Sequence, residues 1–149
     1  MRTRKDRAVP AAVIALTLLL ASGPVARAEL RIVSSPGGEV GSYLRLFAMV
    51  RQSGERVIID GPCLSACTMV LGVIPRERIC VTRRARLGFH AAWNPGDNGA
   101  PVVSAGGTQL LMEIYPQQVR QWINRRGGLT QRMVYLSGRE LTSMYRTCR

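Results

Sequence analysis

A serine and a histidine stand where the chain could carry out nucleophilic chemistry. Ser65 follows a short apolar run at residues 57–59 and a turn signal at residues 60–62, and it opens a run of small residues typical of a helix start. A serine at such a turn lies near the positive end of the helix, which suits a nucleophile and the oxyanion that it generates. His90, the only histidine, follows a second apolar strand pattern. The pair offers a hydroxyl and a base that can accept its proton.

A third element lies upstream of both residues. Residues 35–38 are Ser-Pro-Gly-Gly, and they also fall between a strand pattern and a helical pattern. Glycine at position 38 allows backbone to approach a substrate carbonyl closely. Each feature also has an ordinary structural explanation: Ser65 can cap a helix, His90 can be a core histidine, and the glycine pair can form a tight turn. The three features in this order support the hypothesis of a hydrolase site.

Strand and helix patterns alternate along the chain. We expect strands at 30–33, 57–59, 78–81 and 87–90, and helices at 40–52, 65–73 and 140–145. Leu111, Tyr115, Val119, Trp122 and Ile123 mark another amphipathic helix, interrupted at Pro116, and residues 93–107 form a loop rich in Gly, Pro and Asn. This alternation predicts a single α/β layered domain with a small, mostly parallel sheet flanked by helices.

The first 28 residues have the three parts of a secretory signal peptide. A basic start is followed by an apolar run at 11–21 and an Ala-Arg-Ala cleavage site at 26–28. The run is shorter than the about 20 apolar residues needed to span a bilayer. We therefore expect a mature domain at 29–149 that is periplasmic or secreted and has no membrane span. A retained anchor is the alternative.

Charge excludes some functions. The whole chain has a formal net charge of +12, and removal of the leader takes away five basic residues and one acidic residue. Lys5 is the only lysine, so a Ser–Lys dyad is excluded from the mature domain. The arginines are scattered and aromatic residues make up 5% of the chain, which favours a solvated basic surface. We expect no nucleic-acid partner.

All four cysteines, Cys63, Cys67, Cys80 and Cys148, lie in the exported part, where disulfides persist. Three pairings are open. A Cys63–Cys67 bridge would clamp the turn that carries Ser65, provided that Cys63 precedes the helix, and Cys80 could then tie Cys148 to the sheet. The spacing does not match a zinc site, so we predict disulfides, no metal and no cofactor.

The blocks at 35–38, at Ser65-Ala66 and at residues 88–90 resemble, in this order, the ClpP/crotonase superfamily. More narrowly, the chain is similar to exported ClpP-like proteins of bacteria, in which cysteines flank the nucleophile turn. The resemblance covers residues 30–92 well and the last third loosely. It implies that Ser65 is the nucleophile, that His90 is its general base, and that the backbone N–H groups of Gly38 and Ala66 form the oxyanion hole.

The chain departs from that superfamily in two respects. A strand and a helix that usually precede the Ser-Pro-Gly-Gly block are missing from the mature domain, which leaves the sheet a strand short or with an exposed edge. The triad acid is ambiguous as well. Spacing from His90 points to Glu140, whereas the local pattern at 133–141 puts Arg132 where an aspartate is expected. Loss of the orienting carboxylate can lower the rate about 10⁴-fold.

The leading hypothesis is therefore an exported ClpP-like serine hydrolase that cleaves peptide or other acyl bonds with a Ser–His dyad or an incomplete triad. Ring assembly is common in the superfamily, so the resemblance allows a homo-oligomer, and the sequence leaves the oligomeric state open. The main alternative is a catalytically inactive binding or assembly module with the same fold. A crotonase-like thioester enzyme is disfavoured, because coenzyme A is scarce outside the cytoplasm.

Overall fold

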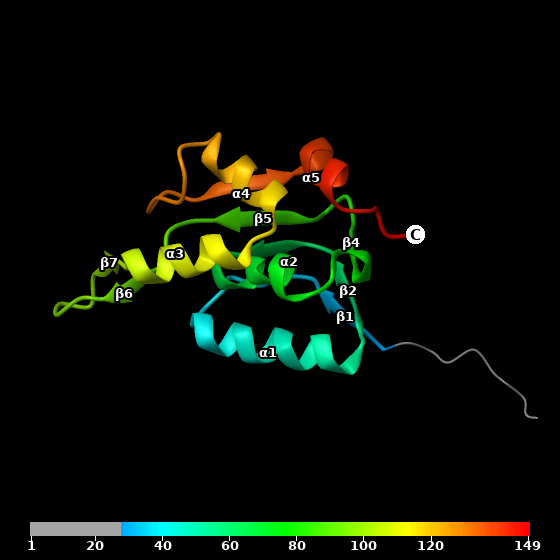
Figure 1. Ribbon diagram of the computed structural model, residues 1–149, viewed down its shortest axis with the longest axis horizontal. Coiled ribbons are helices and arrows are strands. Elements are labelled where there is room, and N and C mark those ends of the chain that lie inside the picture. Colours follow the sequence, from blue (N-terminus) through cyan, green and yellow to red (C-terminus); the bar gives the residue numbers. More distant parts are fainter. Residues whose placement is uncertain (1–27) are drawn as a thin grey trace, which may run out of the picture.

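A computed structural model describes residues 28–149 (Figure 1). The signal peptide expected at 1–28 lies outside the described residues except for Ala28. Within the described part, no helix is both long and apolar enough to cross a membrane.

Two short sheets form the centre of the domain. In the first, β1 (Glu29–Ile32), β2 (Arg56–Ile59) and β4 (Ile79–Val81) are parallel, in the order β1-β2-β4. In the second, β3 (Pro62–Leu64) is parallel to β5 (Arg86–Phe89), and β8 (Val134–Ser137) is antiparallel to β5. The sheets are thus mostly parallel, as predicted. Within residues 28–149, β1 is an edge strand.

The helices lie on both sides of these strands (Figure 1). On one side is α1 (Val40–Ser53), while α4 (Gln117–Asn124) and α5 (Gly138–Met144) lie on the other, beyond β5 and β8. Between them a 3-10 helix, η1 (Ser65–Met69), leads into α2 (Val70–Val73), and a second 3-10 turn, η2 (Arg76–Arg78), precedes β4. The result is the α/β layered architecture that the sequence predicts.

Local sequence explains where the long helix begins and ends. The Glu39 side chain accepts hydrogen bonds from the backbone N–H groups of Gly41 and Ser42, at 2.7 and 2.6 Å, which satisfies the first turn of α1. A hydrogen bond from the Ser42 hydroxyl, together with these two backbone bonds, lowers the pKa of Glu39. The helix ends at Gly54, whose φ of 78° is the left-handed C-terminal cap that glycine favours.

The predicted interruption at Pro116 is confirmed. α3 (Ala105–Ile114) stops before it, and α4 begins directly after it. Tyr115, at the junction, is buried and packs edge-on against Phe89 of β5, with ring centroids 5.3 Å apart. This contact fixes α3 against the end of β5.

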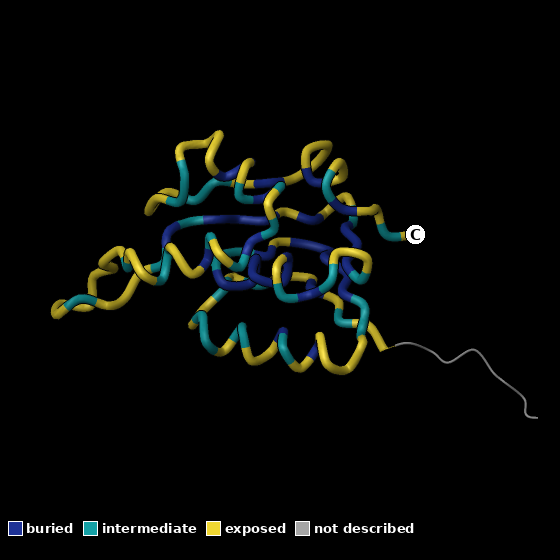
Figure 2. The backbone as a smooth tube through the Cα atoms, in the orientation of Figure 1, coloured by how far each residue is buried: buried dark blue, intermediate teal, exposed yellow. Residues whose placement is uncertain are grey.

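Other parts of the chain differ from the sequence prediction. Residues 93–107 were expected to form a loop, yet they contain a hairpin of β6 (Trp93–Pro95) and β7 (Pro101–Val103) before α3 begins. The strands β3 and β8 were not anticipated either. All four are only three or four residues long, so neither their apolar pattern nor their turns distinguish them from irregular segments. The hairpin projects from the body and is largely exposed (Figure 2).

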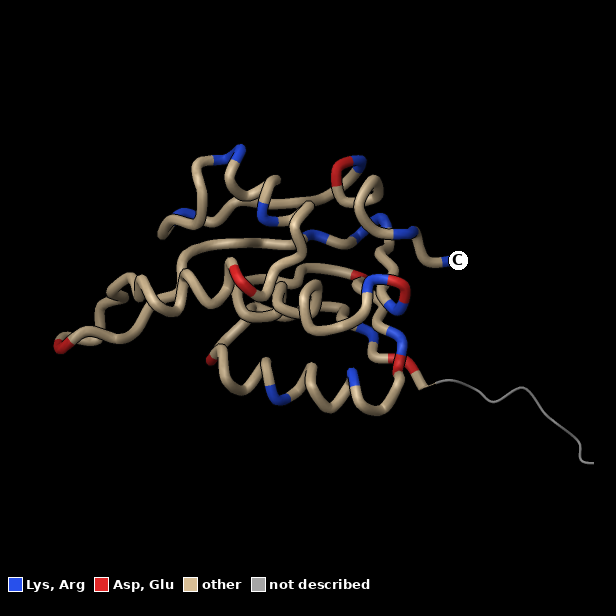
Figure 3. The backbone as a smooth tube through the Cα atoms, in the orientation of Figure 1, with Lys and Arg blue, Asp and Glu red and all other residues tan. Residues whose placement is uncertain are grey.

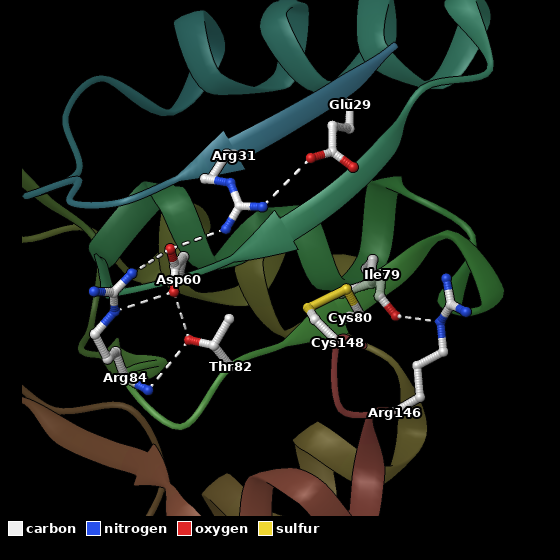
Figure 4. The surroundings of a disulfide bond; sticks show 9 residues. All are labelled: Glu29, Arg31, Asp60, Ile79, Cys80, Thr82, Arg84, Arg146 and Cys148. Atoms are coloured by element: carbon white, nitrogen blue, oxygen red, sulfur yellow. Dashed lines mark hydrogen bonds and ion pairs between the residues drawn. A yellow bond between two sulfur atoms is a disulfide. The ribbon is translucent and has the colours of Figure 1, made fainter. Parts of the chain in front are cut away.

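Both disulfides are present, in the pairing Cys63–Cys67 and Cys80–Cys148. The second bridge joins β4 to the C-terminal segment, where Val81 and Thr147 also form a parallel bridge (Figure 4). The C-terminal segment is therefore fixed to β4, the edge strand opposite β1 in the β1-β2-β4 sheet.

Candidate active site

Ser65 lies at the start of η1, directly after β3, in an unusual backbone conformation. Its φ is 54°, and among residues 28–149 it is the one residue other than glycine with a positive φ. Such a conformation costs about 1–3 kcal/mol and persists only where the surroundings hold it. Here the Cys63–Cys67 disulfide brackets the turn, and the Thr68 hydroxyl donates to the Ser65 carbonyl at 2.7 Å. The turn that carries the candidate nucleophile is therefore held from both sides.

The Ser-Pro-Gly-Gly turn packs directly on this serine turn. The Ser35 backbone N–H donates to Pro62 and its carbonyl accepts from Leu64, so residue 35 continues the sheet beside β3. Gly37 has a φ of 87°, and a Cβ there would lie 2.5 Å from both the Leu64 carbonyl oxygen and the Ser65 Cβ. Only glycine can occupy a position so close to another backbone. The geometry therefore requires glycine at residue 37, whereas at Gly38 a Cβ would meet only the Tyr43 side chain, at 3.4 Å.

Ser65, His90 and the two predicted oxyanion-hole residues line a single groove of about 810 Å³. Ser65 and Ala66 come from the start of η1, Gly38 from the turn before α1, and His90 from the end of β5. Apolar residues of α1 and α3 also line it: Leu44, Leu110 and Leu111. The structure therefore brings the four residues that the sequence singled out to one surface, although they lie in three separate parts of the chain.

The second ring nitrogen of His90 has a defined partner. His90 is half-buried, and its Nδ1 lies 2.7 Å from the backbone carbonyl oxygen of Ala91. A carbonyl oxygen can only accept, so Nδ1 carries the proton and donates. In that tautomer Nε2 has a free lone pair and can accept a proton from a hydroxyl. The Ala91 carbonyl thus accepts the Nδ1 hydrogen bond that a carboxylate accepts in a complete triad.

The antiparallel pairing of β5 and β8 decides which residues can face His90. Phe89 pairs with Val134, and the Ala91 N–H donates to the Thr130 carbonyl at 2.7 Å, so His90 lies opposite the residues that precede β8. Gln131 and Met133 share a second hollow with His90, whereas Arg132 does not line it. Residues 130–133 include no carboxylate.

Glu140 lies elsewhere. It follows β8, and the register puts the end of β8 beside Arg86 at the start of β5, away from His90. Both of its carboxylate oxygens accept from Arg126, at 2.7 and 2.8 Å, and this interaction lowers its pKa. Glu140 lines neither hollow that contains His90. The prediction of Glu140 came from its distance in sequence from His90. That distance takes no account of the antiparallel pairing of β8 with β5, which carries the chain away from His90.

Another carboxylate, Asp60, is buried directly after β2, where hydrogen bonds from neighbouring side chains surround it (Figure 4). It accepts from Thr82 at 2.7 Å, from Arg31 at 3.0 Å and from the Arg84 guanidinium. The bonds to Arg84 and Thr82, with a smaller contribution from Arg31, hold the pKa of Asp60 well below its usual range. Asp60 lines neither hollow. Its hydrogen bonds instead join β1 and the end of β2 to the loop between β4 and β5.

Charge is distributed unevenly over the molecule. Basic residues concentrate around β4 and the C-terminus, whereas the arm formed by the hairpin and α3 shows none (Figure 3). Residues 87–119 contain no Lys or Arg. Among the residues that line the groove, Glu39 is the one acidic side chain. Across residues 28–149 no three His, Cys, Asp or Glu side chains are grouped so that they could hold a metal ion.

Sequence reasoning missed two groups of this site. The Ala91 carbonyl carries no sequence signal, because every residue has one. Tyr43 was not singled out from the sequence, but its hydroxyl lies 2.7 Å from the Ser35 hydroxyl and fixes the glycine turn to the helix. The sequence signal for this role is a tyrosine in the first turn of the helix that follows the Ser-Pro-Gly-Gly block.

Comparisons with known proteins give a limited result. No protein-family model matches the chain, and no curated protein matches it. Among solved structures, the chain is similar to "ClpP1 N165D mutant from Listeria monocytogenes", with 16% sequence identity and a TM-score of 0.46. The match covers 75% of this chain and 66% of that one, so the chain spans slightly less than two thirds of the length of that protein.

Proposed function

We propose that this protein is an exported ClpP-like hydrolase that cleaves peptide or other acyl bonds with a Ser–His dyad. The observation that carries the proposal is the shared groove: Ser65, held at a positive φ, lines the same surface as His90, Gly38 and Ala66. Two disulfides fit an oxidising compartment, in agreement with the signal peptide expected from the sequence. The resemblance of the sequence blocks to ClpP-like proteins supports the same assignment.

The chemistry needs no cofactor. The Ser65 hydroxyl attacks the substrate carbonyl while His90 Nε2 accepts the hydroxyl proton. Negative charge develops on the carbonyl oxygen, where the backbone N–H groups of Gly38 and Ala66 stabilise it, each donor contributing about 2.7–4 kcal/mol. The imidazolium then donates its proton to the leaving group, and water hydrolyses the acyl-enzyme.

The Ala91 carbonyl performs part of the work of a triad acid. It holds the imidazole ring and selects the tautomer with a free Nε2. Because a carbonyl dipole stabilises an imidazolium less than a full negative charge does, we expect turnover to be slow relative to a complete triad. In systems where the carboxylate has been removed the loss is about 10⁴-fold.

A fluorophosphonate probe tests the proposal without knowledge of the natural substrate. The purified mature protein is expected to react at Ser65, with the modified peptide identified by mass spectrometry. Ser65→Ala abolishes labelling, and His90→Ala slows it at least about 100-fold, because base catalysis is lost. Ser34→Ala, an exposed serine outside the groove, is the matched control and keeps the wild-type rate.

The absence of a carboxylate in residues 130–133 favours one other function, a binding or assembly module without activity. That alternative requires Ser65 to be unreactive toward the probe in a folded, oxidised preparation. Labelling of a different serine, or equal labelling of the Ser65→Ala variant, would reject the hydrolase assignment.

A further inference from the structure

A second hollow, of about 500 Å³, adjoins the groove at His90. The hairpin contributes Trp93, Pro101 and Val103 to its lining, and the segment before β8 contributes Gln131 and Met133. Apart from His90 itself, the lining contains no ionisable side chain. Its chemistry is that of a site for an apolar group.

The register of the hairpin turns one apolar face toward this hollow. Trp93 pairs with Val103, and residues two apart on a strand share a face, so Pro101 lies on the same side. Asn94 pairs with Val102, and this pair lies on the opposite face. Because side chains alternate along each strand, the hollow receives the Trp93–Val103 face alone.

That face has no covering element within residues 28–149. Trp93 is 52% exposed and Val103 is 44% exposed, in a hairpin that projects from the body (Figures 1 and 2). A two-stranded hairpin is marginally stable by itself, and an apolar occupant would bury the surface that it leaves in water. The feature is therefore an exposed apolar surface rather than part of the core.

The position of the hollow relative to the dyad indicates which occupant fits. His90 and Trp93 line both the hollow and the groove, so the two depressions are continuous at the imidazole. In acyl transfer, the imidazolium donates its proton to the leaving group, which must therefore lie on the side of the histidine. We infer that the hollow is the leaving-group subsite, and that it selects substrates with a bulky apolar residue directly after the cleaved bond.

The inference rests on the proposed function and specifies its substrate class. The bond from Ser65 Oγ to the carbonyl carbon forms first, and the carbon–nitrogen bond then breaks as the proton taken from the hydroxyl passes from His90 Nε2 to the amine. The amine that departs carries its apolar side chain past Trp93. The acyl part of the substrate occupies the groove between α1 and α3.

Peptide substrates with one fixed acyl part and Gly, Leu or Phe after the cleaved bond test the inference. The wild-type protein is expected to cleave the Leu and Phe substrates with a kcat/KM about tenfold above that of the Gly substrate, the preference typical of a hydrophobic pocket. Val103→Ala reduces the preference about threefold, and Trp93→Ala removes most of it. Val102→Ala is the matched control, because Val102 is the adjacent valine on the other face and is 56% exposed; it keeps the full preference.

A binding measurement separates this inference from the proposed function. Ser65→Ala cannot turn over substrate, yet it is expected to bind leucine amide more tightly than glycine amide. The readout is the fluorescence of Trp93, since the other tryptophan, Trp122, is buried. The Ser65→Ala, Trp93→Ala double variant gives no such change.

The outcomes are distinguishable. If Ser65 reacts with the fluorophosphonate probe but cleavage ignores the residue after the bond, and leucine amide does not bind, the subsite assignment is wrong while the hydrolase assignment stands. If Ser65 is inert, the hydrolase assignment fails whatever binds to the hollow. If Val103→Ala lowers the sedimentation mass without changing selectivity, the hollow is covered by a second copy of the chain and the inference is overturned.

Discussion

Gly37 and Ser65 both have a positive φ, and they pack so closely that a Cβ at residue 37 would come 2.5 Å from the Ser65 Cβ. Gly37 keeps a positive φ against the Leu64 carbonyl, while Ser65 keeps its own positive φ at the centre of the disulfide-bracketed turn. A methyl group at residue 37 would meet backbone atoms, which cannot rotate away as a flexible side chain can. The geometry of the nucleophile turn is therefore sensitive to a change in its neighbour.

Gly37→Ala is expected to abolish fluorophosphonate labelling of Ser65, because the added Cβ displaces the serine turn. Gly54→Ala is the control: its φ is also positive, at 78°, but nothing lies within 4 Å of the new Cβ. That variant is expected to lose only the about 1–2 kcal/mol of stability that a left-handed non-glycine residue costs, measured by chemical denaturation, and to label normally. Normal labelling of Gly37→Ala would contradict the packing described here.

At the scale of elements, the antiparallel pairing of β5 with β8 determines what can orient His90. The residues before β8 face the end of β5, and here they place Met133 beside the hollow that His90 lines. Met133 also lies over Gly88, where a Cβ would come 2.5 Å from its sulfur. The hollow that His90 shares with this segment is thus lined there by an apolar side chain and by no carboxylate.

Met133→Asp is expected to raise kcat/KM at least about tenfold, because a carboxylate beside the ring stabilises the imidazolium that forms in the transition state. The same charge favours protonation of the ring, so the acid limb of the pH–rate profile moves to higher pH. Arg132→Asp is the matched control, since residue 132 does not line the hollow, and it leaves the position of the limb unchanged. An unchanged rate and profile for Met133→Asp would show that residue 133 does not reach His90.

The elements also show how far the sequence could be interpreted without coordinates. The α1 boundaries and the break at Pro116 follow from caps and a missing N–H, which act locally and are visible in the sequence. Ser65 and His90 were identified because their chemistry depends on residue type. The orienting Ala91 carbonyl and the exclusion of Glu140 depend on the register between two short strands, and residue types do not encode that register.

At the scale of the whole molecule, the Asp60 interactions connect parts that are distant in the sequence. Arg31 lies on β1, Asp60 follows β2, and Arg84 lies in the loop that leads to β5 (Figure 4). The pKa of Asp60 is lowered in the folded state, so the fold binds the ionised carboxylate in preference to the protonated one. This contribution to stability is fully present above the ordinary pKa and is lost as pH falls through the lower folded-state pKa.

We expect the free energy of unfolding of the oxidised protein to decrease as pH is lowered from about 5 toward 2, in part through Asp60. Asp60→Asn is expected to be less stable than wild type at neutral pH and to lose less of its free energy of unfolding on acidification. Denaturant titrations at several pH values measure both effects. Asp97→Asn, at an exposed position in the hairpin turn, is the control and keeps the wild-type pH dependence. Parallel pH curves for wild type and Asp60→Asn would show that Asp60 is not responsible.

The bridge between Cys80 and Cys148 also has a consequence for the integrity of the chain. It closes a covalent ring that includes His90, the projecting hairpin and every element up to the C-terminal segment, while Ser65 lies outside that ring. A single cut at the exposed hairpin tip would therefore release no fragment, and the nicked protein would keep the intact mass plus one water until a reductant separated the pieces. Damage to the arm beside the groove would thus escape electrophoresis without a reductant and would show only in an accurate mass or after reduction.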